Sequence, residues 1–183
     1  MKKPSWWCFV TASPPLVYVD ACIFLEVLQK THGRWRDSFK VLQAAERNDI
    51  RLVASRLLDV EVGRFRGDAS KTKVDELVHK YLETVNAQWA ELDFLIARRA
   101  REFSWQYGIK SGADAVHLAT AVHLRADFFM SRDGGFPYGQ TIESTSVVNP
   151  KIVWTPSLMD ASVDNEADSE SSEDVAESHV TSS

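Results

Sequence analysis

The stretch Leu16-Val17-Tyr18-Val19-Asp20 consists of four apolar residues followed directly by a carboxylate. An uninterrupted apolar run of this length is typical of a strand that is buried on both faces of a parallel sheet. A carboxylate at the end of such a strand lies at the edge where open α/β sheets bind their ligands. The stretch therefore predicts the fold class and one member of a functional site.

The residues that follow alternate between helical and extended patterns. We expect helices over 21–30, 38–47, 55–66, 72–86, 93–106 and 114–125, with Ser55 able to cap the third of them. Further strands are expected at 50–54, 126–131 and 151–154. Because strands that alternate with helices form βαβ units, we predict an α/β fold with a mostly parallel sheet.

Four acidic residues stand where capping or solvation alone explains them poorly: Asp20 and Asp133 follow strands, Asp114 opens a helix, and Glu61 falls in the inward apolar stripe of the helix at 55–66. Taken singly, each has an ordinary alternative, such as an N-cap for Asp114 or a turn acid for Asp133. Together they would repel one another unless a hard cation such as Mg²⁺ or Mn²⁺ neutralised them. Such a cation would support the attack of water on a phosphodiester.

Four segments, in this order and spacing, carry a family resemblance: VYVDAC at 17–22, DVEV at 59–62, ADAVHLATA at 113–121 and SRDGGF at 131–136. Through them the sequence resembles a PIN-domain ribonuclease, most closely the VapC-type toxin of type II toxin–antitoxin pairs. The resemblance covers about residues 16–155 and implies a three-layer α/β/α sandwich.

The resemblance also implies the chemistry. Asp20, Glu61, Asp114 and Asp133 would be the catalytic and metal-binding acids of an Mg²⁺- or Mn²⁺-dependent endoribonuclease that cleaves RNA. A small antitoxin would be the partner protein. A homodimer is also implied, with the amphipathic helix at 72–86 as a candidate surface.

The sequence departs from the family beside the first acid. Members often carry Ser, Thr or Asn shortly after it to orient its carboxylate, whereas Ala21 and Cys22 stand here. We therefore expect another donor for Asp20, such as backbone or water. The departure leaves open a catalytically degenerate PIN module that binds RNA or protein without cutting, and an orphan RNA-processing nuclease is a further alternative. A phosphatase with an aspartate nucleophile would need a second Asp where Cys22 stands.

Two further residues are candidate substrate contacts. Arg132 is adjacent to Asp133, and His117 lies one helical turn after Asp114, although a helix histidine satisfied within the protein is the alternative. Glu26, on the first helix, is expected on the solvated surface.

The net charge of −5 depends on where the charges lie. The chain of 183 residues has 21 Lys and Arg against 26 Asp and Glu, a balance that argues against a nucleic-acid partner. Eight of the acids lie within 159–183, a stretch without Lys or Arg, so residues 1–158 carry +3. Neutralising the four candidate acids would raise this to +7. The basic cluster of Arg98, Arg99 and Arg101 is then either a phosphate-binding surface or a solvated helix face.

The composition divides the chain into three parts. We predict a flexible N-terminal arm at 1–15, a nuclease domain at 16–158 and a disordered acidic tail at 159–183, because the tail lacks apolar residues to bury. The two cysteines fit no metal-finger spacing and are expected to be free thiols in a reducing cytosol. No apolar run approaches the roughly 20 residues of a transmembrane helix, so a cytoplasmic protein is expected.

Overall fold

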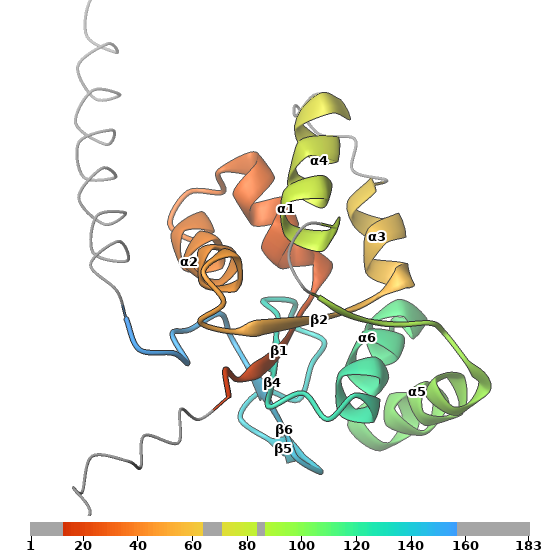
Figure 1. The fold of residues 1–183 in the computed structure, drawn as a ribbon. Coiled ribbons are helices and arrows are strands. Elements are labelled where there is room, and N and C mark those ends of the chain that lie inside the picture. Colours follow the sequence, from red (N-terminus) through yellow and green to blue (C-terminus); the bar gives the residue numbers. More distant parts are fainter. Residues whose placement is uncertain (1–12, 64–70, 84–86, 157–183) are drawn as a thin grey trace, which may run out of the picture.

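The computed structural model describes residues 13–63, 71–83 and 87–156 (Figure 1). The predicted acidic tail lies outside these residues, as does the predicted arm up to residue 12, so both stay predictions. At the end of that arm, the carbonyl of Pro15 accepts a hydrogen bond from the backbone of Arg51 (2.9 Å), which attaches the chain to the sheet before the first strand begins.

Six strands form one sheet in the order β3-β2-β1-β4-β6-β5. Every neighbouring pair is parallel except β5 and β6, which are antiparallel. The prediction of a mostly parallel sheet is therefore confirmed. The strands are β1 (Leu16–Val19), β2 (Arg51–Ser55), β3 (Gln88–Ala90), β4 (Phe128–Met130), β5 (Thr141–Ile142) and β6 (Thr145–Val148).

Helices cover both faces of this sheet. In Figure 1, α1 to α4 lie on one side, and α5 and α6 lie on the other, which confirms the three-layer α/β/α sandwich. Within the described residues, no helix is both long enough and apolar enough to span a membrane. The helices are α1 (Ala21–Gln29), α2 (Trp35–Glu46), α3 (Arg56–Gly63), α4 (Lys71–Val78), α5 (Phe94–Tyr107) and α6 (Gly112–His123), with the π-helix η1 (His79–Glu83) after α4.

Strand β1 contributes to two hydrophobic cores. Val17 and Val19 pack into the core beneath α1 to α4, whereas Leu16 and Tyr18 pack into the core beneath α5 and α6. Successive side chains of a strand point to opposite faces, so a strand covered by helices on both sides must be apolar at every position. This double burial explains the uninterrupted apolar run of the sequence.

One expected strand is wrong. The segment 151–154 forms no strand, and its apolar character serves packing instead, because Trp154 is buried in the core beneath α1 to α4. The last strand of the chain is instead β6, which pairs with β4. Ser55 is the last residue of β2 and directly precedes α3, and its hydroxyl accepts a hydrogen bond from that of Tyr18 (3.1 Å), while its capping of α3 stays a prediction.

The helix expected over 72–86 is α-helical only as far as Val78 and continues as the π-helix η1, with 84–86 outside the described residues. Its apolar positions Val74, Leu77 and Tyr81 are buried within the monomer. Packing inside one chain therefore accounts for the amphipathic pattern, and the homodimer stays a prediction.

A short link between α5 and α6 brings the C-terminal end of one helix to the N-terminal end of the other. Gly108 ends α5 in the left-handed region (φ 67°), and Ser111 caps α6. Between them, Ile109 is buried in the core beneath these two helices, so the backbone of the link is fixed.

We expect Gly108→Ala to lower the free energy of unfolding by about 1–2 kcal/mol, because a Cβ disfavours the left-handed conformation. Urea denaturation measures this loss. Gly112→Ala, at the first position of α6, is the matched control, since its φ is not positive and a Cβ there meets no atom within 4 Å. Equal losses from both substitutions would contradict the account.

Candidate metal centre

Asp20 lies between the end of β1 and the start of α1, and its carboxylate is held from two sides. Oδ1 accepts a hydrogen bond from the backbone N–H of Ala21 (2.8 Å), and Oδ2 accepts one from the hydroxyl of Ser131 (2.7 Å). The residue is only 6% exposed. A buried carboxylate is costly unless hydrogen bonds and charges compensate it, and these two donors supply part of that compensation.

Ser131 is the donor that the sequence left unidentified when Ala21 and Cys22 replaced the usual polar residues. It directly follows β4, the neighbour of β1 in the sheet, and its Oγ also accepts from the backbone N–H of Asp133 (3.0 Å). One hydroxyl thus fixes the first acid and the loop of the last. Its place inside the SRDGGF segment was the only sequence signal for it.

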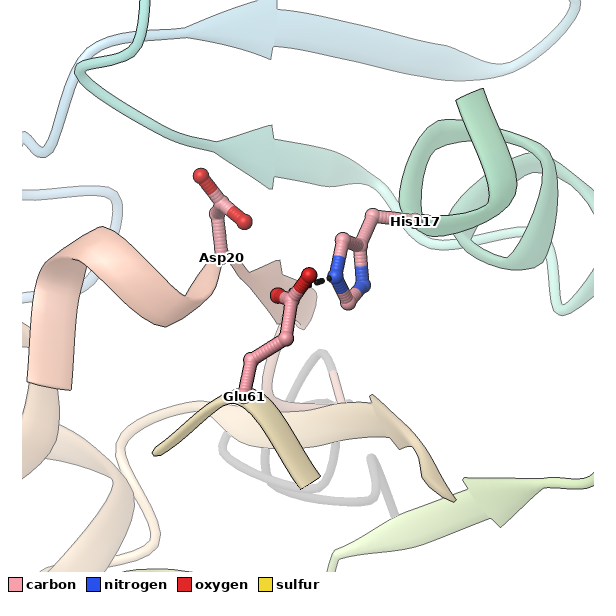
Figure 2. A group of neighbouring side chains, drawn as sticks. All are labelled: Asp20, Glu61 and His117. Carbon is pink, nitrogen blue, oxygen red and sulfur yellow. Dashed lines mark hydrogen bonds and ion pairs between the residues drawn. The ribbon is translucent and has the colours of Figure 1, made fainter. Parts of the chain in front are cut away.

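Glu61 on α3 is held by a chain of buried side chains that starts at α6. Its Oε2 lies 2.7 Å from Nε2 of His117 (Figure 2). The Nδ1 of that ring lies 2.5 Å from the hydroxyl of Tyr18 on β1. His117 and Tyr18 are both 0% exposed. The predicted inward position of Glu61 is therefore correct, although about 30% of its side chain is exposed.

This chain of contacts restricts the histidine ring. Burial raises the pKa of Tyr18 well above its usual range, so the phenol keeps its proton and can donate it in a hydrogen bond. A carboxylate only accepts, so Nε2–H donates to Glu61, whereas Nδ1 faces the hydroxyl of Tyr18, which also contacts the hydroxyl of Ser55 (3.1 Å). The structure thus gives His117 two partners inside the protein. The prediction that it contacts substrate gains no support from this buried position.

Asp114 is the third residue of α6 and does not cap it. The cap is Ser111, whose Oγ accepts from the backbone N–H of Asp114 (3.3 Å), so the capping alternative for Asp114 is wrong. Burial raises the pKa of Asp114 above its usual range, and the negative charges of Asp20 and Asp133 raise it further. The three carboxylates are therefore close enough to repel one another.

Asp133 lies on the exposed loop after β4, whose path is fixed by the hydroxyl of Tyr138 donating to the backbone carbonyl of Asp133 (2.8 Å). Asp133 and Asp114 both line a groove of about 860 Å³. Gly135 lies close to this carboxylate, because a Cβ added to it would make van der Waals contact with Oδ2 of Asp114 at 3.5 Å. The other lining residues are Gln106, Tyr107, Gly108, Lys110, Ser111, Gly134, Phe136, Pro137 and Gln140.

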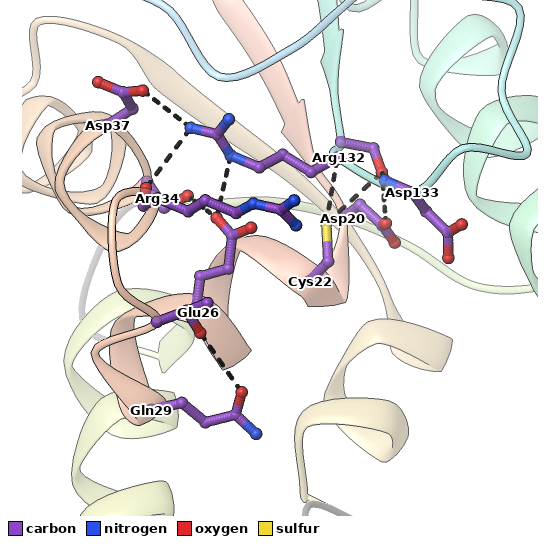
Figure 3. A network of polar contacts seen from close by, with 11 residues as sticks. Asp20, Cys22, Glu26, Gln29, Arg34, Asp37, Arg132 and Asp133 are labelled. Atoms are coloured by element: carbon purple, nitrogen blue, oxygen red, sulfur yellow. Dashed lines mark hydrogen bonds and ion pairs between the residues drawn. The ribbon is translucent and has the colours of Figure 1, made fainter.

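Arg132 is directed away from the acids. Its Nε donates to Oε2 of Glu26 (3.1 Å) and its Nη2 donates to Oδ2 of Asp37 (2.8 Å), which joins the β4 loop to α1 and α2 (Figure 3). Glu26 also accepts from the hydroxyl of Ser38 (2.5 Å) and is 7% exposed, so its predicted surface position is wrong. The RNA contact predicted for Arg132 stays a prediction, with the guanidinium already paired.

The carboxylate set fits a hard divalent cation. Ligand atoms of Asp20, Glu61 and His117 lie within 4.8 Å of one another, and Asp114 and Asp133 face the adjoining groove without belonging to that tight group. No ion pair within the described part of the chain joins a Lys or Arg to any of the four acids. Oxygen ligands with uncompensated negative charge are what Mg²⁺ and Mn²⁺ prefer.

Comparison with known proteins gives one family and several solved structures of similar fold. The family model described as PIN domain matches residues 17–138. A toxin–antitoxin complex from Klebsiella pneumoniae is 21% identical, with 75% of this chain and 99% of that chain covered and a TM-score of 0.52. VapBC2 from Rickettsia felis, bound to a DNA fragment from its promoter, is 13% identical, with 76% and 99% covered and a TM-score of 0.52. No curated protein matches. At these identities the likeness concerns the fold.

We expect Ser131→Ala to weaken Mn²⁺ binding by about tenfold, because Asp20 and the backbone of Asp133 both lose the hydroxyl that positions them. Isothermal titration calorimetry of the full chain measures the affinity. Ser104→Ala on α5 is the control serine and is expected to bind Mn²⁺ normally. An unchanged affinity in Ser131→Ala would show that the hydroxyl does not position the acids.

Tyr18→Phe removes one hydroxyl and leaves the aromatic ring in place. Because buried Nδ1 of His117 and the hydroxyl of Ser55 then both lose a hydrogen-bond partner, we expect the free energy of unfolding to fall by about 1–3 kcal/mol. We also expect the ¹⁵N shifts of His117 to report the Nε2–H tautomer in the parent chain and a changed ring state in the variant. Tyr107→Phe, on half-buried Tyr107, is the control. Unaltered histidine shifts in Tyr18→Phe would contradict the hydrogen-bonded chain.

Proposed function

The chain belongs to the PIN domain family, and on that premise we propose that it is a metal-dependent endoribonuclease and the toxin of a toxin–antitoxin pair. PIN domains are generally nucleases. Two observations carry the proposal: Asp20 and Glu61 lie in one tight group with His117, and Asp114 and Asp133 line a groove in which the charges of Asp20 and Asp133 act on Asp114. Among the described residues, no Lys or Arg forms an ion pair with these four acids.

The four acids differ in position, and we propose a different role for each position. Asp20 and Glu61 are held by buried hydrogen bonds and so present their carboxylates in fixed directions. Asp114 and Asp133 line the open groove, where a substrate phosphate can approach them. Mg²⁺ or Mn²⁺ bound there would lower the pKa of a water molecule and neutralise the charge that develops on the phosphate. Its charge would also relieve the repulsion that raises the pKa of Asp114.

The toxin assignment is supported by the kind of proteins that share this fold. The toxin–antitoxin complex from Klebsiella pneumoniae and VapBC2 from Rickettsia felis each contain a chain that matches this chain over 99% of its own length. We propose a small antitoxin as the partner protein, RNA as the substrate, and a homodimer as the assembly.

The alternatives lose their main support. A degenerate module rested on Ala21 and Cys22, but Ser131 and the backbone of Ala21 now orient Asp20. A phosphatase would need an acid at position 22, where Cys22 instead contacts the hydroxyl of Ser131 (3.5 Å).

We expect the purified chain to cleave structured RNA in Mn²⁺ and not in EDTA, and Asp114→Asn to lose about a hundredfold or more of the rate because one metal-binding carboxylate is gone. Gel analysis of labelled RNA measures both. Asp59→Asn, two residues before Glu61 on α3, is the matched control and should cleave normally. Cleavage in EDTA, or undiminished cleavage by Asp114→Asn, would refute the mechanism.

The toxin role has its own readout. Expression of the parent chain in a bacterial host is expected to arrest growth, whereas expression of Asp114→Asn is not. Normal growth together with RNA cleavage in vitro would leave a processing nuclease in place of a toxin.

A further inference from the structure

The groove lined by Asp114 and Asp133 adjoins a lysine and a tryptophan that metal binding by the four acids does not need. We propose that it binds single-stranded RNA next to the cleaved bond, with Lys110 on a phosphate and Trp105 stacked on a base at the rim. This inference rests on the proposed function, because it takes the acids as the place of cleavage.

The walls of the groove come from two fixed segments. One wall is the last turn of α5 with the link to α6, and the other is the loop after β4. Asp114 and Asp133 belong to its lining, so a bond held at the acids would have its neighbouring nucleotide in this space. A nucleic-acid strand extends on both sides of the bond that is cut. The binding surface must therefore continue beyond the acids, as this groove does.

Lys110 gives this groove a positive charge that the protein does not use. It is exposed, and no ion pair within the described part of the chain includes it. By contrast, Arg98 and Arg99 on α5 are paired with glutamates. The buried side chain of Ile109, directly before it, fixes the backbone from which the lysine extends. A fixed, unpaired cation beside the acid group suits a phosphate of the same strand.

Trp105 is the most exposed large apolar side chain of the described chain, at 86%. It directly precedes Gln106, which lines the groove. The buried positions of α5 are Ile96, Ala100 and Phe103, and helical periodicity puts Trp105 on the opposite side from them. The indole therefore serves no core. Trp105 is not itself a lining residue, but an exposed aromatic one residue before the groove can stack on a base that extends beyond the groove. Proteins bind single strands with such aromatics together with cations, since any base can stack on them.

Fluorescence anisotropy with a labelled single-stranded RNA of about 12 nucleotides tests the proposal. All variants are made in the full-length Asp114→Asn chain with Mn²⁺ present, so that RNA is bound without being cut. We expect Lys110→Glu to weaken binding by about tenfold and to reduce the slope of log affinity against log salt by about 0.7. We expect Trp105→Ala to weaken binding by about tenfold as well. A duplex of the same sequence should bind more weakly, because its paired bases cannot stack.

Two matched controls separate the groove from general effects. Lys71→Glu makes the same charge reversal on α4, in the opposite helical layer, and Phe94→Ala removes an exposed aromatic (75%) at the far end of α5. Both are expected to bind RNA almost as the Asp114→Asn chain does. Losses equal to those of Lys110→Glu and Trp105→Ala would contradict the proposal.

The remaining outcomes distinguish this inference from the proposed function. Unchanged RNA affinity in both groove variants would overturn the inference. Cleavage by the parent chain would leave the proposed function intact in that case. Weaker RNA binding by Lys110→Glu, together with a parent chain that does not cleave RNA with any metal ion tested, would support the RNA-binding groove and refute the nuclease function.

Discussion

The hydrogen bond from Ser131 to Asp20 joins the carboxyl ends of the two central strands, and the acid group depends on it. Asp20 follows a strand with no access to water on either face, so its charge must be stabilised by the protein. The first N–H of α1 and the positive end of that helix supply one part of this stabilisation. The hydroxyl supplies another and at the same time holds the backbone of Asp133. Two of the four acids thus share one positioning residue.

The distribution of arginine partners explains why the acid group remains negative. Arg132 is adjacent in sequence to Asp133, yet its guanidinium pairs with Glu26 and Asp37 on the other side of the loop. Because Glu26 is buried, this pair stabilises the packing of α1 and α2 against the sheet, and removal of the arginine would leave a buried carboxylate without its cation. The same pair keeps the cation away from Asp20 and Asp114.

Local patterns in the sequence were enough for β1, Asp20 and the inward position of Glu61, because each depends on burial that periodicity reveals. Contacts between distant segments were not predictable. Ser131 lies 111 residues from Asp20, and Arg132 lies 106 residues from Glu26, so no local pattern could place either donor or bury Glu26. The prediction of a strand at 151–154 was wrong for a related reason. An apolar run shows that residues are buried, and it does not distinguish pairing in a sheet from packing against one.

The replacement of the usual polar residues by Ala21 and Cys22 changes which segment orients the first acid, and it need not change what the acid does. A donor to Oδ2 of Asp20 can come from any segment that reaches it, and β4 does. Burial, together with the charge of Asp20, raises the pKa of the Cys22 thiol to about 12, so the sulfur stays protonated at neutral pH. A protonated thiol is a poor nucleophile and a poor metal ligand. Its contacts with Ser131 and with the backbone N–H of Arg132 instead hold the β4 loop against α1. Position 22 therefore contributes packing, while the chemistry remains with the carboxylates.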